Sequence, residues 1–157
     1  MLEKTLVIQK CITTYEEKIH EIEQSLGKTR EGAIDAVGSM TSWSDTTKFQ
    51  LSNLALGIQR RLGEAKLTAV QLRQLSPISN PDSPICEGSL FTLRNPDTGK
   101  NLHYLLISKG GGESFDVDGE EIMAISVAVP IAKALIGRKK GDKVSFRNRT
   151  LEIIDVQ

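Results

Sequence analysis

The sequence predicts an α+β protein in which an antiparallel coiled-coil hairpin of two helices precedes a small antiparallel β-sheet domain with one short helix. Two heptad-like stripes of apolar residues predict the helices, and a proline-rich segment separates them from a series of short strands bounded by turn residues. We place the hairpin at residues 1–75, a linker at 76–85 and the sheet domain at 86–157.

The first helix is predicted by an apolar stripe that advances in alternating steps of four and three residues. Its members are Ile8, Ile12, Tyr15, Ile19, Ile22 and Leu26. Steps of this kind form the seam of a coiled coil, because they bring every member onto one face of the helix. We expect the helix to end near Gly38 and Ser39.

A second stripe with the same spacing predicts a second helix, which stops before Ser76 and Pro77. Its members are Leu51, Leu54, Ile58, Leu62, Ala65, Ala69, Leu72 and Leu75. Two such helices joined by a short loop pack antiparallel. At about 1.5 Å per residue, helices of about 30 residues are roughly 45 Å long, which suggests that the hairpin serves to reach a distant site.

The linker and the sheet domain are predicted from turn residues and alternating segments. Three of the five prolines lie in the polar segment 76–84, as is typical of a linker. Strands are expected at 90–94, 102–108, 144–147 and 151–156. A short helix is expected to begin at Pro130 and to stop at Gly137, and the glycines at 110–112 predict a flexible loop.

Composition excludes several classes of protein. Lys and Arg together number 20, as do Asp and Glu, so no overall positive charge attracts the chain to nucleic acid. The cysteines, Cys11 and Cys86, lack the paired spacing of a zinc or redox motif, and we expect free thiols. No apolar run approaches the roughly 20 residues of a membrane span, so we expect a cytoplasmic protein without membrane contact.

The last third of the chain resembles a known family. Residues 126–141, together with 88–95, closely resemble the C-terminal domain of the bacterial transcript cleavage factors GreA and GreB. The residues that match best are Ser126, Pro130, Ile131, Ala132, Leu135, Ile136 and Gly137. The hairpin, linker and C-terminal domain follow the family's order, so the resemblance spans essentially the whole chain. It implies an FKBP-like fold for the C-terminal domain.

The resemblance also implies a partner, bacterial RNA polymerase. Family members dock the C-terminal domain at the rim of the polymerase secondary channel and insert the hairpin toward the active centre. The residues that would form the dock here are Ser126, Val129, Pro130, Ile131 and Ala132. The family's Ser-Pro-Ile-Ala segment has its serine replaced by Val129, so we expect a polar contact to be missing.

The hairpin tip departs from the family pattern. Gre tips carry Gly-Asp-Leu-x-Glu-Asn-Ala-Glu-Tyr, whose first Asp and first Glu help to hold a Mg²⁺ ion in the polymerase active site. Here Ser42 replaces that Asp, Asp45 stands at the Glu position, Trp43 replaces the leucine and Phe49 the tyrosine. A neutral hydroxyl is a poorer Mg²⁺ ligand than a carboxylate. We therefore expect weak or no stimulation of transcript cleavage, and no cofactor beyond a share in the polymerase's Mg²⁺.

A simpler interpretation of the tip stays open. Ser42, Ser44 and Asp45 lie where the second helix begins, and all three are favoured N-cap residues. Trp43 would then pack beneath the cap rather than contact the polymerase. In the Gre-like interpretation, Trp43 and Phe49 are retained apolar supports of the tip.

Basic residues cluster near the end of the chain. They are Arg138, Lys139, Lys140, Lys143, Arg147 and Arg149, with Asp142 as the one acid among them. Contact with nucleic acid or with an acidic polymerase surface is one interpretation. A solvated turn is favoured over it, because no aromatic platform accompanies the cluster. His20 and His103 lack partners at metal-ligand spacing.

We expect a monomeric factor that is not itself an enzyme, acts on the chemistry of RNA polymerase and contacts nascent RNA only indirectly. One alternative is a peptidyl-prolyl isomerase, but Phe, Trp and Tyr make up only 4% of the chain, too little to line a proline pocket. A coiled-coil adaptor that dimerises through its helices is the other alternative.

Overall fold

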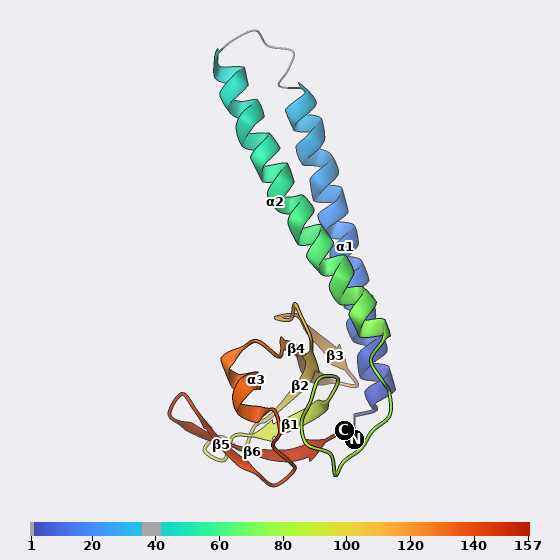
Figure 1. Ribbon diagram of the computed structural model, residues 1–157, viewed down its shortest axis with the longest axis vertical. Coiled ribbons are helices and arrows are strands. Elements are labelled where there is room, and N and C mark those ends of the chain that lie inside the picture. The colour runs from blue at the N-terminus through green and yellow to red at the C-terminus, as the bar shows by residue number, and fades with distance from the viewer. Residues whose placement is uncertain (1, 36–41) are drawn as a thin grey trace. The chain divides into compact units, whose positions relative to one another are not determined.

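A computed structural model describes residues 2–35 and 42–157, with side chains in the second range from residue 46. Two long helices are followed by six strands and one short helix, which confirms the predicted α+β class (Figure 1). By internal contacts the chain forms two compact units, Met1–Thr14 with Val70–Gln157, and Tyr15–Ala69.

The hairpin consists of α1 (Lys4–Asp35) and α2 (Ser42–Arg73), which lie side by side and antiparallel (Figure 1). Within the unit Tyr15–Ala69, Tyr15 and Leu26 of the first predicted stripe are buried. The predicted end of the first helix, at Gly38 and Ser39, lies outside the described residues.

The second stripe is shifted from the prediction at one position. Leu54 is 54% exposed, whereas Ala55 is partly buried. The inward-facing positions therefore run 51, 55, 58, 62, 65 and 69, which keeps the alternating steps of four and three without interruption. The regular spacing of the seam thus decides which residue faces α1, and Ala55 takes the place predicted for Leu54.

The helices are also joined by polar contacts along their flanks. Lys66 Nζ lies 2.6 Å from Glu23 Oε1, and Arg30 donates to Gln59 Oε1 at 3.2 Å. The hydrogen bond from Lys66 is the main cause that lowers the pKa of the Glu23 carboxyl. Both contacts are exposed, so each contributes little to the stability of the hairpin.

The strands form a single sheet in the order β3-β4-β2-β1-β6-β5. Their bounds are β1 (Leu90–Arg94), β2 (Asn101–Ile107), β3 (Ser114–Val117), β4 (Glu120–Ser126), β5 (Lys143–Phe146) and β6 (Arg149–Val156). Neighbouring strands pair antiparallel except β2 and β4, which pair in parallel with Leu105 opposite Ala124. The predicted sheet is therefore mixed at this one pair.

Strands β3 and β4 were not predicted. They are joined by a two-residue turn at Asp118 and Gly119, whose φ angles are 55° and 83°. A turn of this kind favours Asp-Gly, because both positions need a positive φ. The dipeptide was visible in the sequence and was the signal for this hairpin.

One face of the sheet carries an apolar core covered by α3 (Pro130–Leu135) (Figure 1). The short helix begins and stops where Pro130 and Gly137 predict, and Gly137 has a φ of 83°. The buried cluster consists of Ile85, Phe91, Leu93, Leu106, Ile125, Ala132, Leu135, Val144, Leu151, Ile153 and Val156. The rings of Phe91 and Tyr104 stack at the edge of this cluster, with centroids 5.6 Å apart.

The segment between α2 and β1 is fixed at two points. Lys4 Nζ donates to the Ile78 carbonyl at 3.0 Å, and burial lowers the pKa of this lysine. Farther along, Ile85 donates to Arg138 O at 2.8 Å and accepts from Gly137 N at 2.9 Å. The second pair of bonds ties the start of the sheet domain to the end of α3.

Candidate functional site

We call residues 126–132 the docking turn: they run from the end of β4 into α3 and contain all five residues predicted to dock on a partner. Ser126 ends β4 and is only 8% exposed. Its hydroxyl accepts from the Ala128 amide at 3.1 Å and donates to the Ser108 carbonyl at 3.4 Å. Because both bonds are internal, Ser126 shapes the turn.

Val129 is the N-cap residue of α3. Its φ and ψ of −72° and 147° are those of a cap, but no side chain caps the helix. A serine or threonine hydroxyl at this place would accept a hydrogen bond from the first turn of the helix. With Val129 at this place, α3 lacks such an internal cap.

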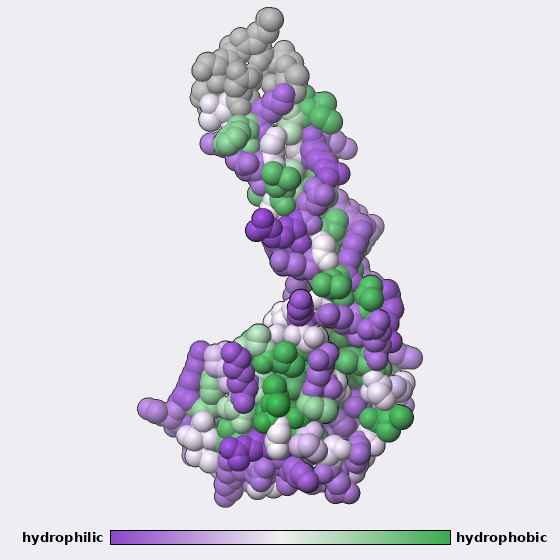
Figure 2. Space-filling model, viewed as in Figure 1, coloured by the Kyte–Doolittle hydropathy of each residue, from purple (hydrophilic) through white to green (hydrophobic). Residues whose placement is uncertain are grey.

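The remaining docking residues differ in how far they reach the surface. Pro130 is exposed, Ile131 is partly buried and Ala132 is completely buried in the core. Ile136, just after the helix, is 43% exposed. Pro130, Ile131 and Ile136 thus give α3 an apolar surface. Figure 2 shows apolar surface over α3 and the strands beside it, with hydrophilic side chains on either side. A surface of this kind fits an apolar face of another protein.

A glycine supports the docking turn from behind. A Cβ on Gly111 would lie 2.9 Å from Ser126 N and 3.0 Å from Ala124 O, and the residue has a φ of 94°. Next to it, Gly112 donates to Ala124 O at 2.8 Å. The glycine loop predicted to be flexible is thus hydrogen-bonded against β4, where only a residue without a side chain fits.

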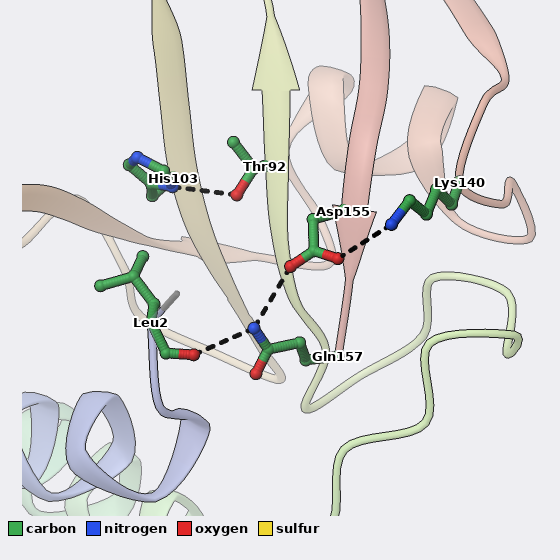
Figure 3. Close-up of polar contacts among 6 residues, drawn as sticks. All are labelled: Leu2, Thr92, His103, Lys140, Asp155 and Gln157. Carbon is green, nitrogen blue, oxygen red and sulfur yellow. Dashed lines mark hydrogen bonds and ion pairs between the residues drawn. The ribbon is translucent and has the colours of Figure 1, made fainter.

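Polar side chains lie on the sheet, as Figure 3 shows. His103 Nδ1 lies 2.9 Å from Thr92 Oγ1, and His103 Nε2 lies 3.2 Å from Glu120 Oε2 without the alignment of a hydrogen bond. On β6, which lies next to β1, Asp155 accepts a hydrogen bond from Gln157 Nε2 at 3.2 Å. The same carboxylate lies 3.6 Å from Lys140 Nζ. His103 is therefore a residue of the sheet with polar neighbours on two sides.

A hydrogen bond from Gln157 ties the start of the chain to the end of the last strand. Gln157 Nε2 also donates to the Leu2 carbonyl at 3.0 Å (Figure 3).

Both cysteines are free, Cys11 buried and Cys86 exposed. Burial raises the pKa of the Cys11 thiol to about 12.

At the hairpin tip the helix α2 has already begun at Ser42. Ser44 and Asp45 lie in its first turn, and the interpretation of Ser42, Ser44 and Asp45 as N-cap residues stays a prediction. The side chains of Ser42, Trp43 and Asp45 lie outside the described residues. Phe49 is 67% exposed, so the expectation that it supports the tip as a packed apolar residue is wrong.

The ranges 2–35 and 46–157 contain no group of three His, Cys, Asp or Glu side chains arranged to hold a metal ion. Across the described part of the chain, no helix is long and apolar enough to cross a membrane.

Comparison with known proteins bears on the sheet domain above all. Residues 80–157 match the family described as "Transcription elongation factor, GreA/GreB, C-term". Over 89 residues the chain is 38% identical to the transcription elongation factor GreA of Helicobacter hepaticus, covering 57% of this chain and 51% of that protein. Over 98 residues it is 32% identical to GreA of Thioalkalivibrio sulfidiphilus, covering 60% of this chain and 58% of that protein. The chain thus spans little more than half the length of these relatives.

Among solved structures, the chain is similar to GreA factor homolog 1 (Gfh1) of Thermus thermophilus. The identity is 17%, the alignment covers 93% of this chain and 94% of that chain, and the TM-score is 0.39. This structural similarity is too weak to support an argument about function.

Proposed function

We propose that this chain, which is a divergent member of the GreA/GreB family of transcription elongation factors, binds bacterial RNA polymerase through the turn between β4 and α3. In this proposal the hairpin enters the secondary channel and modulates elongating or backtracked complexes, with weak or no stimulation of transcript cleavage. The protein contributes no active site of its own, and it contacts nascent RNA only within the complex.

The observation that carries the proposal is the geometry of the docking turn within the matched domain. Pro130 is exposed at the start of α3, and the apolar side chains of Ile131 and Ile136 flank it at the surface. The turn beneath is held by the internal bonds of Ser126 and by the close approach of Gly111. A rigid support of this kind lowers the conformational entropy lost on binding.

The expectation of weak cleavage rests on the tip sequence. The family pattern places two carboxylates at the tip as ligands for a hard divalent ion, and this chain supplies one there, Asp45, with a serine at position 42. The aspartate is also one methylene shorter than the glutamate of the family pattern. The remaining carboxylate would have to approach the ion more closely to bind it.

Docking is tested by a matched pair of substitutions in the full-length chain. Ile131→Glu places a charge on the apolar surface of α3, whereas Met123→Glu places the same charge on β4 at a residue that is 38% exposed and outside the turn. We expect the wild type and Met123→Glu to co-purify with the cognate core polymerase and Ile131→Glu to be lost. Equal binding of both variants would refute the assigned surface, and no binding by the wild type would refute the proposed function.

Action at the active centre is tested separately by RNA shortening in backtracked complexes. We expect the wild type to shorten the RNA little or not at all, and to suppress shortening by an authentic Gre factor by competing for the channel. Efficient shortening that is lost in Asp45→Ala would contradict the inference drawn from the incomplete acidic pair, while leaving the docking result intact.

A further inference from the structure

The surface that the docking turn does not use carries a concentration of positive charge. Between residues 133 and 149 the chain has seven Lys or Arg and a single acid, Asp142, although the whole chain has 20 of each sign. We call these seven residues the basic edge: Lys133, Arg138, Lys139, Lys140, Lys143, Arg147 and Arg149. All seven are exposed. The excess of negative charge therefore lies elsewhere in the chain.

The fold gathers the basic edge at one end of the sheet. β5 is the outermost strand next to β6, and the turn that leads into β5 follows directly from α3 (Figure 1). The Asp142 carboxylate accepts from the Lys139 amide at 2.9 Å, so the acid is engaged in shaping this turn. Figure 2 shows hydrophilic surface where the hairpin of β5 and β6 projects.

Most of these charges have no counter-ion among the residues that the structure describes. Among the described residues, only Lys140 of the seven lies within ion-pair distance of a carboxylate, that of Asp155 at 3.6 Å. Like charges that lie close together repel one another and favour the unfolded chain. An anionic partner would relieve this repulsion.

In the turn between β5 and β6, an arginine occupies a backbone conformation that is unfavourable for this residue type. Arg147 and Asn148 have φ angles of 49° and 60°. Asparagine, aspartate and glycine are the residues that favour such positions, and arginine is not among them. The Arg147 guanidinium lies 5.3 Å from the ring centroid of the partly buried Phe146. The tip of this hairpin thus offers a cation beside an aromatic ring.

We propose that the basic edge binds a single strand of nucleic acid, with lysines and arginines on the phosphates and a base stacked at the pair formed by Phe146 and Arg147. Aromatic rings and guanidinium planes stack on bases of any sequence, and a basic strand edge follows the phosphate backbone. An acidic protein segment would satisfy the charges but would make no use of the ring. This inference goes beyond the proposed function and does not depend on docking at α3.

The test measures the binding of a labelled oligouridine to the full-length chain by fluorescence anisotropy, with two matched triple variants. Lys139→Gln/Lys143→Gln/Arg147→Gln removes three charges from the basic edge. Lys10→Gln/Arg94→Gln/Lys100→Gln removes three exposed charges from other parts of the same compact unit. We expect the first variant to bind about 10-fold or more weakly at about 0.1 M salt, and its dependence of log K on log salt to be shallower by about 2. The second variant should bind like the wild type.

Two single variants separate stacking and folding from charge. Phe146→Leu should weaken oligouridine binding several-fold while leaving the salt dependence unchanged. Arg147→Gly suits the turn better, so it should weaken binding without lowering the unfolding midpoint.

Three outcomes would overturn the proposal. They are no oligouridine binding by the wild type at low salt, an equal loss of binding in both triple variants, and displacement of oligouridine by polyglutamate at a lower concentration than by unlabelled oligouridine. The last result would point to an acidic protein segment as the partner.

Discussion

Replacing Gly111 with alanine tests whether the docking turn depends on the close approach of the glycine loop. Gly111 and Gly112 have φ angles of 94° and 88°, so alanine at either place costs about 1–2 kcal/mol for the backbone conformation. Their surroundings differ. A Cβ on Gly111 would meet Ser126 N at 2.9 Å and Ala124 O at 3.0 Å, whereas a Cβ on Gly112 would meet nothing within 4 Å.

The additional cost at Gly111 follows from what the new methyl group contacts. Both atoms belong to the backbone of β4, so neither can rotate away, and overpacking of this kind typically costs about 1–3 kcal/mol. We therefore expect Gly111→Ala to destabilise the sheet domain by about 2–5 kcal/mol and Gly112→Ala by about 1–2 kcal/mol. The difference between the two variants isolates the steric contact, because the backbone cost is common to both.

Native-state hydrogen exchange in urea is the suitable assay, because the chain has two compact units and a single overall transition would mix them. The amide of Ile153 in β6, which donates to Asp142 O at 2.9 Å, reports on the sheet domain away from the glycine loop. Equal free energies of unfolding for the two variants would show that the loop does not press on β4. Reduced polymerase binding by Gly111→Ala alone would connect the contact to the docking turn.

Three further changes have defined expectations. Burial raises the pKa of the Cys11 thiol from 9.0 to about 12, so between these pH values the thiol ionises only in the unfolded chain. The free energy of unfolding should therefore fall by about 1.4 kcal/mol for each pH unit in that range. Urea titrations of Cys11→Ala should not show this slope. Val129→Thr keeps the shape of the side chain and adds a hydroxyl at the N-cap, so it should raise the stability of the sheet domain by about 1 kcal/mol; an unchanged value would show that α3 gains nothing from a cap. Ala65→Lys places a charge at a buried position and should lower the thermal midpoint of the hairpin clearly, whereas Leu54→Lys should change stability by less than about 0.5 kcal/mol; a loss in Leu54→Lys as large as that in Ala65→Lys would restore Leu54 to the stripe.

The parts of the fold that follow local rules were predictable from the sequence. The heptad steps gave both helices, and Pro130 and Gly137 gave the limits of α3, because helix starts and stops depend on the few residues around them. Strand β4 escaped prediction because Ile122, Ala124 and Ile125 are all buried, so its second half lacks the alternation that marks a strand exposed on one face. Its pairing with β2 in parallel is a long-range property that no local pattern reports.

The candidate site divides in the same way. Pro130 was located from the resemblance and is exposed, but no local pattern indicates that the hydroxyl of Ser126 is bonded internally or that Gly111 lies behind it. These contacts join segments that meet only in the folded sheet. The basic edge was visible as a run of charges, whereas the position of Arg147 beside the Phe146 ring required the hairpin geometry. The interpretation as a solvated turn stays a prediction, and the Phe146 ring is the observation that supports the alternative.

The order of strands in the sheet also has a consequence for how fast the two parts of the chain fold. β1, the first strand, lies between β2 and β6, the last strand, so the centre of the sheet stays open until segments far apart in the sequence have met. The helical hairpin needs mainly the meeting of two neighbouring helices. Long-range pairing slows folding, because the entropy of closing a large loop is lost before the contacts form. In a stopped-flow refolding experiment the helices should therefore form first, and the docking turn, which depends on β4 and its partners, should be completed in a later and slower phase.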